Sequence, residues 1–163
     1  MTYSQKYTIV QFLAPIQDSQ VFAMKDWPLH ITLADVFAIK LDQPLLDQLA
    51  TFLAAKKSFS VTAKGEGRLG GKNEDSIKVT LIKNTPELQL LHDGLIDLLE
   101  TNGAVFNSPQ FTHQGFLPHA THQSHAQLST GQRAVIDKLS LVDMFVDGNW
   151  QQRKVLETIK LKT

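Results

Sequence analysis

The chain has 163 residues, a length that suits a single domain with a buried core of its own. Its 16 lysines and arginines balance 16 aspartates and glutamates, so no excess of positive charge is present to hold long nucleic acid nonspecifically. The sequence has no cysteine, which excludes disulfides, thiol nucleophiles and cysteine-ligated metals.

The distribution of apolar residues bears on location. No stretch approaches the roughly 20 apolar residues that a membrane helix needs, and residues 1–7 lack the basic and apolar segments of a signal peptide. We therefore expect a cytoplasmic protein with no membrane partner. The expected organisation is one domain over residues 1–163, monomeric by default.

The first third of the chain is predicted to contain two strands and a helix. β-branched and aromatic residues favour strands over 7–14 and 30–37. Apolar residues at helical spacing follow, with Asp42 placed to cap the N-terminus. They predict an amphipathic helix over 42–56.

The middle third is predicted to contain a strand pair and a second helix. Strands are expected over 59–64 and 76–83, joined by a glycine-rich loop. The helix has Thr85 as N-cap, a proline at its first position and Gly103 at its end. His92, on this helix, is expected at the surface or at its boundary.

The last third is predicted to end in a hairpin. A strand or loop is expected over 105–111, and residues 129–138 suggest a short helix. Two strand-like runs, 139–146 and 153–161, turn at Asp147-Gly148-Asn149. The order of elements makes the two halves rough echoes of each other.

One tripeptide pattern, His-x-Thr, occurs twice, as His30-Ile31-Thr32 and His119-Ala120-Thr121, each after an apolar residue and a proline or the reverse. Alternate side chains of a strand share a face, so each motif presents an imidazole beside a hydroxyl. If the fold brings the motifs together, one histidine can act as base and the other as acid, while the hydroxyls bind phosphate oxygens. Hydrolysis of a 2′,3′-cyclic phosphate needs that set of groups.

The two motifs, their spacing and the strand pair between the helices resemble the two-histidine (2H) phosphoesterase superfamily, which includes the RNA 2′-5′ ligase-like proteins and cyclic phosphodiesterases. The resemblance implies an α+β, two-lobed, pseudo-symmetric fold of antiparallel sheets with flanking helices and a central cleft. It implies that His30 and His119 are catalytic and that Thr32 and Thr121 bind the substrate phosphate. Because two histidines on opposite sides of a phosphate support in-line displacement without a metal, we expect no metal or other cofactor, and an RNA end or a small nucleotide as substrate.

Other residues extend this hypothesis. Trp27 and Phe116, each close to a motif, are candidates for stacking on a base. The residue after the second motif is His122 where the superfamily usually has an apolar residue, and strand alternation predicts that it points away from the cleft.

Two alternatives remain open at the level of the sequence. The first is a module that binds an RNA end or a nucleotide with little turnover. The second is a metal-binding protein that uses the histidine-rich stretch from His113 to His125. The second is the weaker because the stretch has no metal-ligand motif such as HExxH.

Overall fold

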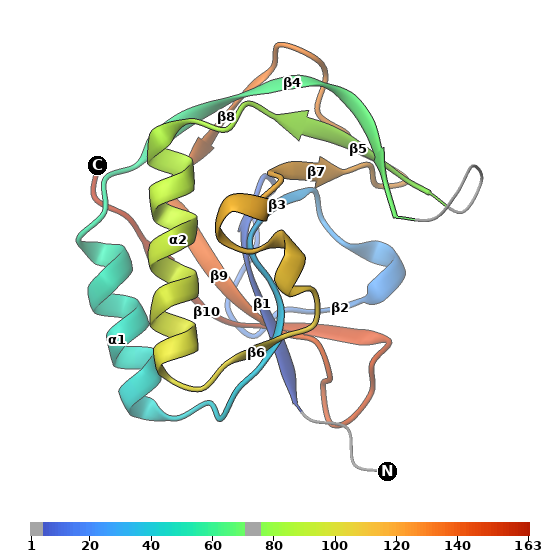
Figure 1. Ribbon diagram of the computed structural model, residues 1–163. Coiled ribbons are helices and arrows are strands. Elements are labelled where there is room, and N and C mark those ends of the chain that lie inside the picture. The colour runs from blue at the N-terminus through green and yellow to red at the C-terminus, as the bar shows by residue number, and fades with distance from the viewer. Residues whose placement is uncertain (1–4, 71–75) are drawn as a thin grey trace.

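The computed structural model describes residues 5–70 and 76–163, which form two antiparallel sheets and two α-helices (Figure 1). This architecture confirms the predicted α+β fold of two sheets with flanking helices. Within the described ranges, no helix is long and apolar enough to cross a membrane.

The larger sheet has six strands in the order β2-β10-β9-β1-β3-β6. The strands of this sheet are β1 (Lys6–Phe12), β2 (Val21–Ala23), β3 (His30–Ala38), β6 (Val105–Phe106), β9 (Lys138–Asp143) and β10 (Gln152–Lys160). All neighbouring strands are antiparallel, so the predicted C-terminal hairpin of β9 and β10 is confirmed. Asp147 and Gly148 in its turn have positive φ angles of 51° and 80°.

The smaller sheet has four antiparallel strands in the order β7-β5-β4-β8. The strands of this sheet are β4 (Phe59–Leu69), β5 (Ile77–Ile82), β7 (His119–Thr121) and β8 (Arg133–Ile136). In Figure 1 these strands arch over the larger sheet, with β7 on the side that faces β3.

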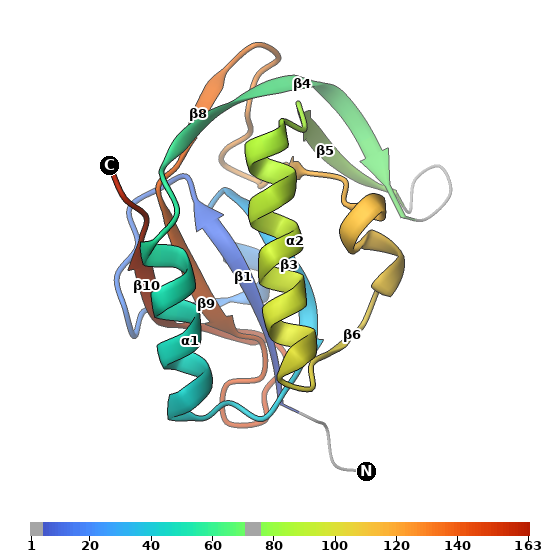
Figure 2. The ribbon, with the colours of Figure 1, turned by 60° about the vertical axis from the view of Figure 1, so that its left-hand side comes forward.

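The two helices lie side by side on one side of the molecule, against the larger sheet (Figures 1 and 2). Helix α1 spans Gln43–Ala54 and helix α2 spans Pro86–Thr101. Both predicted N-caps are confirmed, because Asp42 Oδ1 accepts from Leu45 N at 3.0 Å and Thr85 Oγ1 accepts from Leu88 N at 3.3 Å. Capping of this kind satisfies amide groups that have no partner within the helix.

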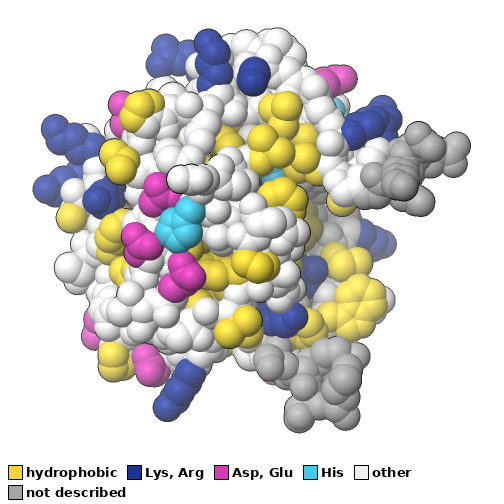
Figure 3. Space-filling view, viewed as in Figure 1, with side chains coloured by type: hydrophobic (Ala, Val, Ile, Leu, Met, Phe, Trp, Pro, Cys, Tyr) yellow, Lys and Arg dark blue, Asp and Glu magenta, His cyan; other side chains and the backbone are white. Residues whose placement is uncertain are grey.

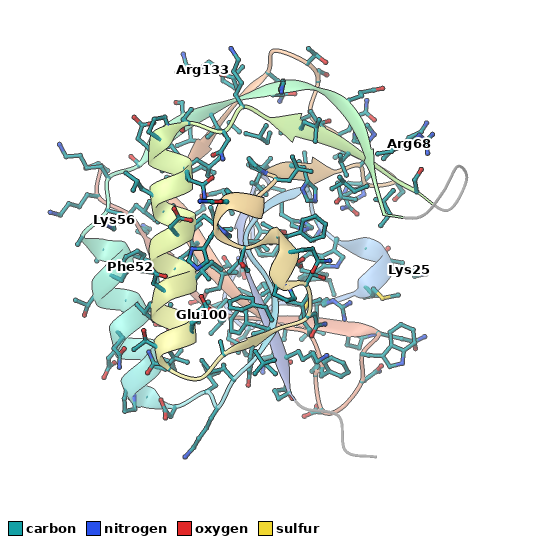
Figure 4. All side chains as sticks on the ribbon, viewed as in Figure 1. Lys25, Phe52, Lys56, Arg68, Glu100 and Arg133 are labelled. Atoms are coloured by element: carbon teal, nitrogen blue, oxygen red, sulfur yellow. The ribbon has the colours of Figure 1, made fainter. Side chains whose placement is uncertain are left out.

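A ring at the α1–α2 contact shows how closely the helices pack. Phe52 of α1 lies so near Gly94 of α2 that a Cβ there would be 2.5 Å from the ring. Lys56 covers the same ring, with its Nζ 4.8 Å from the centroid, and Figure 4 shows both side chains at α1. The inner faces of both helices join one apolar core that reaches both sheets, through residues such as Leu49, Leu95 and Val61.

Three predicted segments differ from the structure. Residues 129–138 hold no helix but strand β8, which pairs with β4 because Arg133–Ile136 supplies β-branched residues beside an edge of the smaller sheet. Strand β4 continues to Leu69 through two glycines that were expected in the loop, whose remainder, 71–75, lies outside the described residues. The segment 105–111 divides into the short β6 and a 3-10 turn at Pro109–Phe111.

Candidate active site

The two His-x-Thr motifs lie on strands from different sheets that approach each other. His30 and Thr32 are at the start of β3 in the larger sheet, and His119 and Thr121 form the ends of β7 in the smaller one. Ile31 and Ala120, the middle residues, are both fully buried. The period-two alternation predicted for each motif is therefore present, with the histidine and threonine on the opposite face from the core.

The same local hydrogen bond fixes the ring of each candidate catalytic histidine. His30 Nδ1 donates to the Pro28 carbonyl at 2.8 Å, and His119 Nδ1 donates to the Leu117 carbonyl at 2.7 Å. In both motifs the acceptor lies two residues before the histidine. Because a carbonyl only accepts, each ring carries a proton on Nδ1 and keeps Nε2 for proton exchange.

Two adjoining cavities contain all four motif residues. A polar cavity of about 200 Å³ is lined by His30, Thr32 and Thr121, together with Thr8 and Gln123 among others. An apolar cavity of about 230 Å³ is lined by Thr32 and His119 together with apolar side chains of the neighbouring elements. Since Thr32 lines both, the cavities meet at the first motif and form one cleft between the sheets.

The protonation of His30 is set by its surroundings. Burial lowers the pKa of His30 to about 4, and the positive charge of a protonated His119 lowers that pKa further, against the opposing hydrogen bond to Pro28. At neutral pH the imidazole of His30 is thus uncharged. A neutral imidazole with Nδ1–H has a free lone pair on Nε2, which is the form that can accept a proton.

The Trp27 ring is part of the packing around His30. Its centroid lies 4.4 Å from that of His30 and 4.9 Å from that of Phe22, and the Arg153 guanidinium lies 5.8 Å from it. Trp27 lines the polar cavity. The structure shows Trp27 packed against His30, and its part in base stacking stays a prediction.

Phe116 lines the apolar cavity with one ring face stacked on His92, at a centroid distance of 3.8 Å and an angle of 3°. Base stacking by Phe116 also stays a prediction. His92 was expected near the surface, and that expectation is wrong because its side chain is only 1% exposed. Its Nδ1 donates to the Leu33 carbonyl at 2.7 Å, and its Nε2 accepts from His113 N at 3.0 Å.

Within the 113–125 stretch, His122 and His113 have separate partners. His122 Nε2 lies 2.9 Å from Thr80 Oγ1, which agrees with the prediction that it points away from the cleft. His113 sits outside the cleft against Glu100 of α2, with Nε2 3.0 Å from Oε1, and this contact raises the pKa of His113. The structure therefore does not gather these histidines into one metal site.

Acidic side chains do meet one histidine on the outer face of α2. In the described part of the chain, the ligand atoms of Asp97, Glu100 and His113 lie within 4.8 Å of one another. Figure 3 shows acidic groups and a histidine gathered over this face, and Figure 4 places Glu100 there. These residues are largely exposed, and the contacts describe surface ion pairs with His113.

Three polar residues of the cleft were not singled out from the sequence. Thr8, Asp35 and Gln123 all line the polar cavity, and Asp35 also lines the apolar one. Thr8 and Asp35 sit inside strands, where nothing local marks a polar side chain as facing a cleft. Gln123 lies two residues after the second motif, and that proximity is the one signal that could have found it.

Comparison with known proteins identifies the family of this chain. Residues 9–152 match the family model of the 2′-5′ RNA ligase superfamily, so the chain belongs to that superfamily of 2H phosphoesterases. Similar solved structures include E. coli LigT complexed with 3′-AMP, with 14% identity, a TM-score of 0.57 and coverage of 99% of this chain and 100% of that one. The protein TT0787 of Thermus thermophilus has 16% identity, a TM-score of 0.60 and coverage of 96% and 98%.

A structure described as a phosphoesterase is also similar, with 14% identity, a TM-score of 0.59 and coverage of 99% of this chain and 100% of the other. At such identities these likenesses show the fold. No curated protein matches the sequence.

Proposed function

We propose that this protein is a metal-independent phosphoesterase that opens a 2′,3′-cyclic phosphate, or a related phosphodiester, at an RNA end or on a nucleotide. The observation that supports it best is the pairing of two identically held histidines beside two threonines in one cleft. Superfamily membership supports phosphoester chemistry, and a protein of the same fold, E. coli LigT, has been crystallised with 3′-AMP, NADP+ and ATP.

The mechanism assigns one proton transfer to each histidine. His30 Nε2 takes a proton from water, and the water oxygen attacks phosphorus. The bond from phosphorus to one ribose oxygen breaks, and His119 Nε2 donates a proton to that oxygen. The neutral state of His30 supports its role as the base, which leaves His119 as the acid.

The threonine hydroxyls have a separate task. Thr32 and Thr121 donate hydrogen bonds to the phosphoryl oxygens that gain charge as the water attacks. With a ribose hydroxyl in place of water as the nucleophile, the same groups would join an RNA end to a cyclic phosphate. Hydrolysis is the simpler proposal because it needs only one bound nucleotide.

The test measures conversion of the four 2′,3′-cyclic nucleotides, in the presence of a chelator, by wild type, His30→Gln and His119→Gln. Exposed His125→Gln is the matched control, since it makes the same substitution outside the cleft. We expect chelator-resistant product that each cleft variant lowers by at least about 10²-fold while the control retains it. Full activity in either cleft variant would contradict the mechanism. Binding without turnover by wild type would favour the binding module.

A further inference from the structure

A carboxylate lies where the substrate phosphate is expected. Asp35 lines both the polar and the apolar cavity, and it is the only acidic residue among the described residues that line either one. No lysine or arginine lines them in the same described ranges. A negative side chain beside a bound phosphate costs binding energy through repulsion, so its position calls for a favourable contact with another part of the substrate.

An irregularity in the backbone of β3 places Asp35 in the cleft. Ile9 of β1 pairs with Ala34, but its neighbour Val10 pairs with Thr32, so β3 has one extra residue there. Leu33 and Ala34 are both fully buried although they are consecutive. Such a β-bulge reverses the alternation of faces, and it moves Asp35 from the core face to the face of Thr32.

Two buried polar side chains hold this bulge. His92 Nδ1 donates to the Leu33 carbonyl at 2.7 Å, and Thr8 Oγ1 donates to the Ala34 carbonyl at 2.7 Å. His92 is 1% exposed and Thr8 is 4% exposed. Because the carbonyls of the bulge are satisfied by side chains from α2 and β1, the displaced register is a fixed feature of the fold.

The cavity next to Asp35 is lined mainly by apolar side chains. Leu69, Ile77, Phe111 and Leu117 line it, and three of these are large apolar residues that are at least 39% exposed. Figure 3 shows apolar side chains gathered on this face beside the β4–β5 hairpin. Exposed apolar surface around a cavity is typical of a ligand site.

We propose that Asp35 reads the edge of a nucleobase in the apolar cavity and gives the enzyme a preference for guanine. A carboxylate only accepts hydrogen bonds, and guanine is the base whose N1–H and N2–H₂ place two donors side by side. Adenine and cytosine each offer one amino group next to an acceptor, and uracil offers one N–H between two acceptors. The inference rests on the proposed nucleotide chemistry of the cleft.

The experiment compares all four bases in two measurements. Turnover of the 2′,3′-cyclic nucleotides gives kcat/KM, and calorimetric titration with the four 3′-nucleoside monophosphates gives Kd. The variant is Asp35→Asn, whose amide oxygen can still accept from Val36 N, as Oδ1 of Asp35 does at 2.8 Å. Exposed Asp18→Asn makes the same chemical change outside the cleft and is the matched control.

We expect wild type and Asp18→Asn to favour guanine by about tenfold or more in both measurements, as hydrogen bonds to a charged acceptor allow. In Asp35→Asn this preference should fall to within about threefold. Turnover without a guanine preference, or an equal loss for all four bases in Asp35→Asn, would overturn this inference and leave the proposed function standing. Guanine-selective binding without turnover would overturn the proposed function and leave this inference standing. No binding of any nucleotide would overturn the inference and the proposed function together.

Discussion

The indole of Trp27 packs on the imidazole of His30, with their centroids 4.4 Å apart and their planes 33° apart. Phe12 lies on another side of His30, at a centroid distance of 6.1 Å. These rings cover part of the imidazole, and burial is the largest cause of the low His30 pKa. Their packing therefore links an aromatic cluster to the protonation state of the proposed base.

The first prediction concerns the pH dependence of kcat/KM. His30 must be neutral to act as base, and its pKa of about 4 predicts an acidic limb near that pH. Trp27→Ala admits water to the imidazole and should raise the pKa towards the ordinary value of about 6.5, so the acidic limb moves to higher pH. Profiles of both proteins on one cyclic nucleotide check this. Identical acidic limbs would show that Trp27 does not control His30, and a wild-type limb near the ordinary histidine pKa would contradict burial of the base.

The second prediction concerns the threonine hydroxyls. Thr32→Val and Thr121→Val replace a donor by a methyl group of the same shape, so the strands should persist while stabilisation of phosphoryl charge is lost. We expect kcat/KM to fall by about 10- to 100-fold in each variant. Thr51→Val, at an exposed position of α1, is the control and should match wild type. Unchanged kinetics in both cleft variants would remove the hydroxyls from the mechanism.

Much of the fold follows from local signals in the sequence. Asp42 and Thr85 mark helix starts because their side chains accept hydrogen bonds from backbone amides. The positive φ of 89° at Gly103 shows why a glycine ends α2. The two motifs are visible because His and Thr at alternate positions share a strand face. Which residues form the helices and where the motif side chains point are both local properties.

The parts that local signals could not predict depend on contacts between distant segments. Strand β8 forms because β4 offers an unpaired edge, which no feature within residues 129–138 reveals. His92 is buried because the Leu33 carbonyl, freed from the sheet ladder, meets α2 from β3. Asp35 faces the cleft because of the bulge in β3. Strict alternation in the sequence would assign it to the core face.

The third prediction concerns the buried ring of His92. His92→Phe keeps a ring against Phe116 but leaves the Leu33 carbonyl and the His113 amide without their partner. One buried carbonyl and one part-buried amide without partners should lower the free energy of unfolding by about 2–4 kcal/mol, measured by urea denaturation. His125→Phe, at an exposed position, is the control. A loss no larger than that of the control would mean that the bulge carbonyl finds another donor.

The fourth prediction concerns the segment that leads into the second motif. A Cβ at Gly115 would lie 1.8 Å from the Gln110 carbonyl oxygen, so Gly115→Ala must displace the backbone of the 3-10 turns. That segment carries Phe116 and the Leu117 carbonyl that holds His119 Nδ1. Displacement should therefore lower both the Tm and kcat/KM, the latter by about tenfold or more.

Gly65→Ala is the matched control for this last change, because a Cβ at Gly65 meets nothing within 4 Å. Turnover separates two consequences of the Gly115 substitution. If His119 is held only by its own strand, kcat/KM at a temperature well below the Tm will equal that of the control. If the carbonyl two residues before His119 sets its ring, as its 2.7 Å hydrogen bond indicates, activity will fall while the protein is still folded.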